Sequence, residues 1–308
     1  MIRPPQFPSL GRPVGPTLYA PATRSDLALL GTTRYPDLGS VVYCTEDAIL
    51  EHEVPAALAQ LRTALPQLAD QPGPARFIRV RDVEVLRAVL TLDLSGVQGV
   101  VLPKVHDGNL GAYMALLETR PEVLVMPTLE TREALSEHRM TLLRDLIFQQ
   151  GWHSQMLCLR IGGNDLMNAL GVRRTPGRTL YEGPLERVIS MLIGVFKPYG
   201  FTLSSPVYEV FEDLATLARE VQQDLEYGLS GKTIIHPVQL GTVLAGYRVG
   251  SGDLAEARAI LDPGARAVFK MNGRMCEPAT HRLWARDIVA RAEVYGTLPP
   301  QAHEALSF

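Results

Sequence analysis

Eight short apolar runs recur along the chain, and each is separated from the next by a segment long enough to form a helix. Runs such as SVVYC and VLVMP are continuously apolar, which is typical of parallel strands that are covered on both faces. They span Thr17–Ala22, Ser40–Cys44, Ala75–Val80, Gly99–Lys104, Glu122–Glu130, Gln155–Gly162, Phe201–Pro206 and Gly231–Pro237. Eight alternating units of strand and helix predict an α/β protein that closes into a (β/α)8 TIM barrel.

The segments between these runs have helical patterns of apolar residues. They span Asp47–Leu68, Val83–Ser95, Asn109–Arg120, Glu130–Gln150, Leu185–Tyr199, Phe211–Tyr227 and Val238–Tyr247. After the eighth run the pattern changes to a helix at Gly252–Leu261, an apolar run at Ala267–Met271 and a turn at Asn272-Gly273. We therefore expect a Pro-rich arm at residues 1–16, a barrel at 17–250 and a helical extension at 251–308.

The extension ends in a long predicted helix, Pro278–Tyr295, with proline in the first turn, where it is tolerated. Its apolar residues at helical spacing are Leu283, Trp284, Ile288, Val289 and Ala292. A barrel does not need this helix for closure. The apolar stripe either covers its own barrel or packs on a neighbouring subunit, and we favour the neighbouring subunit.

Composition excludes several classes of protein. Of 308 residues, 46% are hydrophobic and 20% charged, and the net charge of −3 favours neither nucleic acid nor a membrane surface as a partner. No apolar run is long enough to span a bilayer, and the first residues lack the apolar core of a secretory signal. Cys44, Cys158 and Cys276 are odd in number and lack metal-binding spacing, which indicates a reduced, cytoplasmic protein.

In a closed barrel the C-terminal ends of all strands meet on one face, and catalysis takes place there. Glu130 and Asp165 follow the fifth and sixth runs, so their carboxylates could share one cation, and two carboxylates suit Mg²⁺. Alternatively, each acidic residue opens a helix and stabilises its positive end, with Asn164 as the cap. Gly162-Gly163 favours the first interpretation, because close approach to a ligand often requires glycine.

Arg79 ends the third run, where a guanidinium suits a bidentate carboxylate or phosphate. The alternative is a salt bridge to Glu46, Asp47 or Asp82. Glu46 and Asp47 follow the second run and could orient Arg79 or hold metal-bound water, or they could simply begin a helix.

Three further candidates lie at strand ends. Lys104 could form a Schiff base, although we favour an ion pair with Glu46 or Glu130. His236 could act as a general base, but a histidine before proline is as often structural. Ser205 is a candidate for substrate binding by its position alone. The chain contains no HExxH zinc motif, no GxGxxG motif and no P-loop.

These residues are set in segments that resemble the HpcH/HpaI aldolase and citrate lyase β-subunit superfamily. The matching segments are TEDAI at Thr45–Ile49, FIRV at Phe77–Val80, VVLPK at Val100–Lys104, TLET at Thr128–Thr131, GGNDL at Gly162–Leu166 and GKTIIHPVQL at Gly231–Leu240. GKTIIHPVQL is the most specific, since it is typical of the citrate lyase-like branch.

The resemblance implies a (β/α)8 barrel that makes or breaks a C–C bond next to a carbonyl, usually with Mg²⁺. It assigns Glu130 and Asp165 to the metal and Arg79 to the substrate. It also implies assembly into trimers or hexamers, in which Glu277 from a neighbouring subunit would occupy the position of the family's base.

The chain departs from the family's pattern around the substrate. It reads Cys44-Thr45-Glu46-Asp47 where the branch usually has Asp-Leu-Glu-Asp, it has Arg81 in place of an asparagine, and it has Glu277 in place of an aspartate. We therefore expect a divergent member whose metal site is kept and whose pocket is changed.

The resulting prediction is a cytoplasmic carbon–carbon lyase that uses Mg²⁺, or Mn²⁺ in its place. It would act through a metal-stabilised enolate on a small anionic substrate, either a 2-oxo acid or a CoA thioester similar to citryl-CoA or malyl-CoA. The base would be Glu277 or His236. The alternative is a catalytically silent barrel that binds metal and ligand in a regulatory or assembly role.

Overall fold

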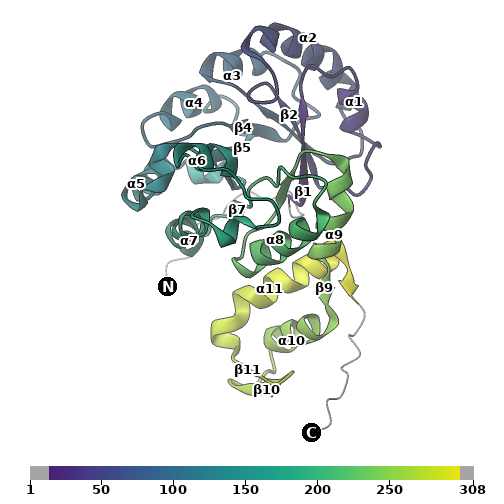
Figure 1. Ribbon diagram of the computed structural model, residues 1–308, viewed down its shortest axis with the longest axis vertical. Helices are drawn as coiled ribbons and strands as arrows, with labels where there is room; N and C mark the ends of the chain where they lie inside the picture. The colour runs from purple at the N-terminus through teal and green to yellow at the C-terminus, as the bar shows by residue number, and fades with distance from the viewer. Residues whose placement is uncertain (1–13, 299–308) are drawn as a thin grey trace. The chain divides into compact units, whose positions relative to one another are not determined.

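Eight parallel strands form the centre of the computed structural model, which describes residues 14–298 (Figure 1). They are β1 (Pro16–Pro21), β2 (Ser40–Cys44), β3 (Ala75–Arg79), β4 (Gly99–Leu102), β5 (Leu124–Leu129), β6 (Leu159–Ile161), β7 (Leu203–Ser204) and β8 (Lys232–Ile234). Each lies within or overlaps one of the eight predicted runs. Most are shorter than predicted, because polar and apolar residues at the ends of the runs lie outside the paired part of the sheet.

The sheet closes on itself. Each strand from β1 to β6 pairs in parallel with the next along the chain, and β1 also pairs with β8. Between β7 and β8 the contact is a parallel bridge at Ser205 and Lys232, where the Ser205 amide donates to the Gly231 carbonyl at 3.0 Å. The predicted (β/α)8 barrel is confirmed, and all strand ends that carry candidate residues lie on its C-terminal face.

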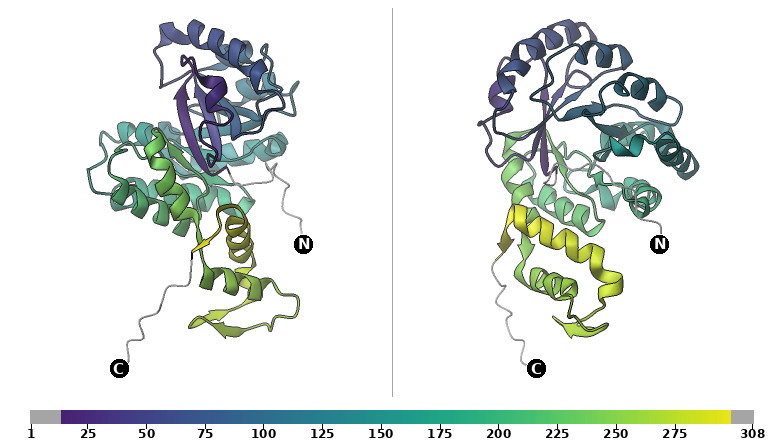
Figure 2. Two further views of the ribbon diagram at one scale, coloured as in Figure 1. Left: turned by 90° about the vertical axis from the view of Figure 1, so that its right-hand side faces the viewer. Right: turned by 180° about the vertical axis from the view of Figure 1, so that it is seen from behind.

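Helices surround the strands, and Figures 1 and 2 show α2 to α5 as an arc outside them. The helices are α1 (Leu27–Leu30), α2 (Val54–Ala64), α3 (Val83–Val89), α4 (Leu110–Leu117), α5 (Glu137–Gln149), α6 (Gly163–Ala169), α7 (Leu185–Phe196), α8 (Leu214–Glu226) and α9 (Leu240–Tyr247). The seven predicted helices all form. Short helices α1 and α6 were not predicted, because four and seven residues carry too little periodicity.

The interior of the barrel changes character along the strands. Val42, Phe77, Val101, Met126 and Cys158 form an apolar cluster inside it. Two residues further along β3 and β5, the inward positions are polar. The apolar core therefore fills the inner part of the barrel, and the layer at the C-terminal ends of the strands contains polar and charged groups.

Residues from Leu244 onward form a second compact unit. It contains β9 (Val249–Gly250), α10 (Ser251–Leu261), β10 (Phe269–Met271), β11 (Arg274–Cys276), α11 (Pro278–Tyr295) and β12 (Thr297–Leu298). The predicted turn at Asn272-Gly273 joins β10 and β11 with positive φ angles of 48° and 76°, which a type I′ hairpin requires.

The stripe of α11 divides into two parts. Ile288 is buried in a cluster with Ala257 and Ile260 of α10, whereas Leu283 is 76% exposed and Trp284 is 37% exposed within the chain. Packing on a neighbouring subunit remains a prediction. The predicted arm at residues 1–16 lies mostly outside the described residues, and the boundary at residue 250 also stays a prediction. No helix in the described part combines the length and the apolar character needed to span a membrane.

Candidate active site

Five charged residues converge where β2 to β5 end. Arg79 is central: its Nη2 lies 2.8 Å from Glu46 Oε2, 2.9 Å from Glu130 Oε1 and 3.3 Å from Asp47 Oδ2. Lys104 Nζ bonds Glu46 Oε1 and lies 3.4 Å from Asp47 Oδ1. The salt bridges considered from the sequence form with Glu46 and Asp47. The carboxylate of Asp82 instead caps α3, where it accepts from the amide of Val85 at 2.8 Å.

The position of Arg79 follows from strand pairing. Arg79 lies in register with Cys44 of β2, and its carbonyl accepts from both the amide and the hydroxyl of Thr45, at 2.9 and 2.8 Å. Arg81, two residues on, donates from Nη2 to the carbonyls of Glu46 and Ile49, at 2.8 Å each. The arginine that replaces the family's asparagine thus fixes the backbone of the loop that carries Glu46.

Lys104 has the backbone of a turn, not of a strand. Its φ of 52° is left-handed, and its amide donates to Glu130 Oε1 at 2.9 Å. Burial alone would lower the pKa of Lys104, but Glu46 and Asp47 outweigh it and raise the pKa. A protonated amine is not a nucleophile, so the geometry favours the ion pair over the Schiff base.

Glu130 is the most perturbed carboxyl group of the cluster. Glu130 is only 4% exposed. Burial, with a contribution from the charge of Asp165, raises the pKa of Glu130 to about 7 against the opposing effect of Arg79. A carboxylate that shares a site with another carboxylate is stabilised in its charged form when a cation lies between them.

Asp165 lies in the first turn of α6, and Gly162 is the N-cap residue, without a side-chain cap. The expectation that Asn164 caps this helix is wrong, since Asn164 lies inside it. Glu130 does not open a helix either, because β5 ends at Leu129 and the next helical turn begins only at Arg132. Of the two acidic residues, only Asp165 fits the helix-dipole interpretation.

Gly162 lets Glu130 pack directly against backbone. A Cβ atom at Gly162 would lie 2.2 Å from Glu130 Oε2 and 2.4 Å from Glu130 Cβ, which no packing allows. A ligand was expected to approach Gly162-Gly163 closely; at Gly162 the group that does so is the carboxylate of Glu130.

Ser205 and His236 are engaged at the junction of β7 and β8. The buried Ser205 hydroxyl donates to the Gly231 carbonyl at 2.8 Å. His236 is exposed, its Nδ1 accepts from the Val238 amide at 3.2 Å, and its ring stacks on Phe211 at 5.0 Å. Glu277 belongs to the second unit, where it precedes α11 and its Oε2 accepts from the Thr280 hydroxyl at 3.3 Å. Their predicted roles stay predictions.

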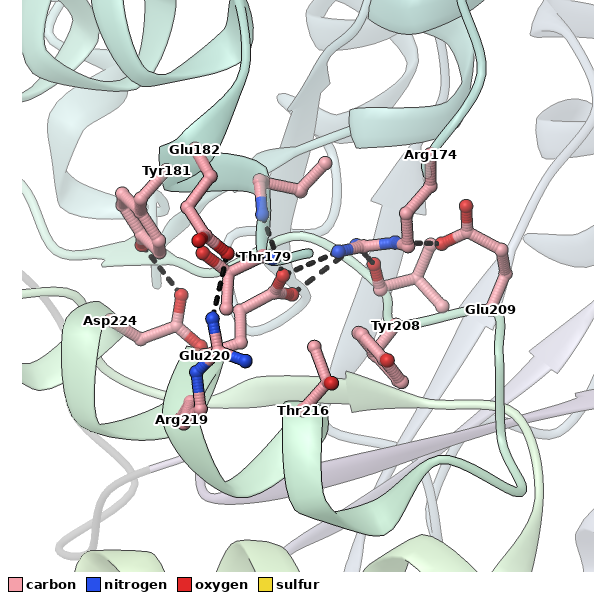
Figure 3. A network of polar contacts seen from close by, with 12 residues as sticks. Arg174, Thr179, Tyr181, Glu182, Tyr208, Glu209, Thr216, Arg219, Glu220 and Asp224 are labelled. Atoms are coloured by element: carbon pink, nitrogen blue, oxygen red, sulfur yellow. Dashed lines mark hydrogen bonds and ion pairs between the residues drawn. The ribbon is translucent and has the colours of Figure 1, made fainter. Parts of the chain in front are cut away.

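A buried ionic network beside α8 was not predicted. Lys232 Nζ lies 2.8 Å from Glu220 Oε1 and 2.9 Å from Asp224 Oδ2, and all three side chains are buried. Figure 3 shows Glu220 also bound by Arg174, and Asp224 bound by the Tyr181 hydroxyl at 2.6 Å. One signal could have found it: the acidic residues Glu220 and Asp224 are four residues apart on the buried stripe of α8, which also contains Leu217 and Val221.

A cavity of about 610 Å³ lies between the loops that follow β6 and β7. Its lining includes Arg173, Arg174, Glu209 and Phe211. Because both loops extend from the C-terminal ends of strands, this cavity opens on the same face of the barrel as the Arg79 cluster.

The chain matches the family model of the C–C bond lyases of the TIM-barrel fold over residues 10–297. It is 30% identical to a citrate lyase subunit beta-like protein of Deinococcus radiodurans over 268 residues, which cover 83% of this chain and 87% of that protein. It is 26% identical to a (3S)-malyl-CoA thioesterase of Cereibacter sphaeroides over 291 residues, which cover 91% of this chain and 95% of the relative.

Among solved structures, the barrel is similar to protein CitE of Mycobacterium tuberculosis in complex with magnesium, acetoacetate and coenzyme A. The TM-score is 0.67 at 23% identity, with 92% of this chain and all of that chain covered. At this identity the likeness supports the fold. The family match and the Deinococcus relative go further: this chain is a member of the C–C bond lyase family of the TIM-barrel fold, within the citrate lyase β-subunit-like superfamily.

Proposed function

We propose that the protein is a Mg²⁺-dependent carbon–carbon lyase that acts through an enolate on a 2-oxo acid or an acyl-CoA thioester. The observation that carries this proposal is Glu130, which is buried beside Asp165 with its pKa raised to about 7. Both carboxylates lie at the mouth of the barrel. A divalent cation between them would favour their charged forms and offset the raised pKa of Glu130.

The donor set fits Mg²⁺. Among the described residues, no group of three or more His, Cys, Asp or Glu side chains is arranged to hold a metal ion by itself, as a closed site of the zinc type requires. Magnesium instead binds through one or two carboxylates and keeps water or substrate oxygens as its other ligands. Glu130 and Asp165 supply two hard oxygen donors, and Mn²⁺ would fit the same pair.

The roles of the residues follow from this geometry. When bound, Mg²⁺ would neutralise the negative charge that develops on a carbonyl oxygen as the C–C bond breaks. Arg79 would bind the substrate's carboxylate: its Nε is buried and has no partner in the described residues. Glu46 and Asp47 hold the guanidinium in place, and Lys104 in turn bonds Glu46. Glu277 of a neighbouring subunit, or His236, would move the proton.

Two substrate classes remain. The relatives named as malyl-CoA thioesterases and the CitE complex with coenzyme A support a thioester, and the cavity with Arg173 and Phe211, formed by segments that follow β6 and β7, would offer room for its larger part. The two-carboxylate site equally suits a free 2-oxo acid. A homotrimer or hexamer would place the exposed Leu283 and Trp284 of α11 against a neighbour.

Proton NMR in D₂O tests the proposal. With Mg²⁺ present, the methyl signal of pyruvate or of acetyl-CoA should fade as enolate formation exchanges its protons, and EDTA should stop the loss. The signal that fades identifies the substrate class. If Mg²⁺ binds and neither methyl group exchanges, the lyase proposal fails for both, and the silent metal- and ligand-binding barrel becomes the better interpretation.

Arg79→Lys should weaken pyruvate binding in the presence of Mg²⁺ by about tenfold or more. Lysine keeps the charge but loses the planar fork that holds Glu46 and Glu130 while it binds a ligand carboxylate. The measurement is the Kd of pyruvate by calorimetry. The matched control is Arg87→Lys, at an exposed position on α3. Wild-type affinity in the Arg79 variant would remove Arg79 from the binding site.

Gly162→Ala should reduce Mg²⁺ affinity by about tenfold or more, because the new methyl group must displace the Glu130 carboxylate, and displaced ligand geometry typically costs 10–100-fold. The φ of Gly162 is −88°, so alanine is not strained there. Gly194→Ala is the control, since a Cβ at Gly194 meets nothing within 4 Å. Equal Mg²⁺ affinities in the two variants would show that the packing of Glu130 does not matter to the metal.

A further inference from the structure

A row of polar side chains crosses the barrel interior one layer below Glu130. Thr128 of β5, Arg160 of β6 and Ser204 of β7 are directly in register, so their side chains point to the same face of the sheet. They are 6%, 2% and 1% exposed. Barrel interiors at this depth are usually filled by branched apolar residues. A guanidinium between two hydroxyl groups therefore needs an explanation.

Arg160 has few partners for a buried cation. Its Nη2 donates to the Thr233 hydroxyl at 2.6 Å, its Nη1 approaches the sulfur of Met126 at 3.8 Å, and the ring of Tyr19 lies 5.3 Å from its Cζ. Burial raises the pKa of Tyr19, so its phenol stays neutral. Within the described residues, no carboxylate pairs with Arg160.

The other buried arginines are compensated by oxygen atoms. Arg76 donates to the carbonyls of Gly31, Leu68, Gly96 and Gln71. Arg174 pairs with Glu209 and Glu220, and Arg79 pairs with carboxylates of the cluster. Of the four arginines that are buried in the described chain, Arg160 is the one that binds neither a carboxylate nor a carbonyl oxygen.

The neighbours of Arg160 are also incompletely bonded. The hydroxyl oxygens of Thr128 and Ser204 are buried and have no hydrogen-bond partner in the described part of the chain. A buried polar atom without a partner costs free energy, and native proteins keep few of them. Two unpartnered hydroxyl groups on either side of an uncompensated guanidinium form a cradle for a group that accepts hydrogen bonds and carries negative charge.

The cradle lies close to the Arg79 cluster at the mouth of the barrel. Tyr19 and Thr233, which contact Arg160, are only partly buried, whereas Val14 in the apolar cluster below is buried. Tyr19 is also close enough to Arg79 and Glu130 to interact with their charges. Thr128 of β5 lies two residues before Glu130, which directly follows the strand, and two residues of extended chain span about 6.6 Å.

We propose that Arg160, Thr128 and Ser204 form an anion subsite that binds the second carboxylate of a 2-oxo dicarboxylic acid. This inference rests on the proposed function, which places the oxo-acid end at Arg79, Glu130 and Asp165. The distal carboxylate would reach one layer deeper and accept hydrogen bonds from the Arg160 guanidinium and the two hydroxyl groups. Arg160 would thus select a dicarboxylate over a monocarboxylate.

The test compares two probes in the presence of Mg²⁺, pyruvate and freshly dissolved oxaloacetate, which differ by one carboxylate. The wild-type protein should bind oxaloacetate more tightly. Arg160→Met should weaken oxaloacetate binding by about tenfold or more and leave pyruvate binding unchanged, so that the preference disappears. The double variant Thr128→Val, Ser204→Ala should also reduce the preference for oxaloacetate over pyruvate, by a smaller factor than Arg160→Met does.

Stability separates a binding role from a structural one. Arg160 binds no carboxylate and no carbonyl oxygen, so replacing this buried charge should not lower the unfolding temperature, and Arg160→Met should be at least as stable as wild type. Arg76→Met, at a buried arginine that binds four carbonyl groups, should be clearly less stable. A binding residue that costs stability is a common trade-off.

The outcomes are distinct. If pyruvate binds and Arg160→Met keeps the wild-type preference, the subsite is overturned while the proposed function stands. If wild type binds neither acid with Mg²⁺, the proposed 2-oxo acid site fails and the subsite fails with it. If Arg160→Met does not fold, the paired Thr128 and Ser204 variant decides, and wild-type oxaloacetate affinity in that variant overturns the subsite.

Discussion

A Glu130→Gln, Asp165→Asn double variant is expected to lose Mg²⁺ binding, with a fall in affinity of more than about 100-fold. The change removes both negative charges that would face the cation and keeps the size of the side chains. Amide oxygens are weaker ligands for a hard divalent ion than carboxylates. The measurement is calorimetric titration of Mg²⁺ at pH 8, where Glu130 is mostly ionised because its pKa is about 7.

The fold of this double variant should survive. Glu130 is buried with its pKa raised, so a neutral side chain at this position removes a desolvation cost. Glu84→Gln with Asp93→Asn makes the same chemical changes at exposed positions and serves as the control. Unchanged Mg²⁺ affinity in the Glu130, Asp165 variant would exclude this pair as the metal site.

The positions of the cluster could be predicted because they depend only on strand ends. Any side chain at the C-terminal end of a barrel strand lies on one face, so the strand ends predict Arg79 and Glu130 on the same face, but they do not predict the ion pair between them. The contacts themselves could not be read from the sequence. They depend on register, such as Cys44 opposite Arg79, and on a left-handed turn at Lys104 that no propensity predicts.

Interior polar residues were harder to find. Arg160 lies in the run MLCLRIG, where a single arginine in an apolar strand can point either to the barrel interior or to the helix layer. The role of Arg160 depends on its neighbours Thr128 and Ser204. They lie about 30 and 40 residues away in the sequence, and only strand pairing brings them next to Arg160. The network around Lys232 depends on how α8 packs against β8, and its one sequence signal is the four-residue spacing of Glu220 and Asp224.

The segment GKTIIHPVQL indicated the family, and the structure shows what several of its residues stabilise. Lys232 joins the ionic network of α8. Gln239 is buried, accepts from the amides of Ile235 and His236 at 2.9 and 3.2 Å, and donates to the Tyr208 carbonyl at 2.8 Å. These contacts fix the end of β8 to the loop after β7. The specificity of the segment therefore reflects barrel closure at least as much as chemistry.

Lys232→Met should destabilise the barrel by about 3–5 kcal/mol, because it leaves Glu220 and Asp224 buried without their shared cation. Arg174 still binds Glu220, but no described cation other than Lys232 pairs with Asp224. The measurement is urea unfolding at pH 7. Arg87→Met removes a cation from an exposed pair with Glu84 and should change the free energy of unfolding by less than about 1 kcal/mol.

The loss should depend on pH in a defined direction. Burial alone would raise the pKa of Glu220, but Lys232 and Arg174 outweigh it and lower the pKa below the usual 4.5. The network's stabilisation through Glu220 is therefore complete above pH 4.5 and is lost as the pH falls through the folded-state pKa. The difference in unfolding free energy between wild type and Lys232→Met should be largest at neutral pH and narrow in acid. A constant difference from pH 7 to acid would mean that methionine acts through packing and that the ion pairs contribute little to the stability of the barrel.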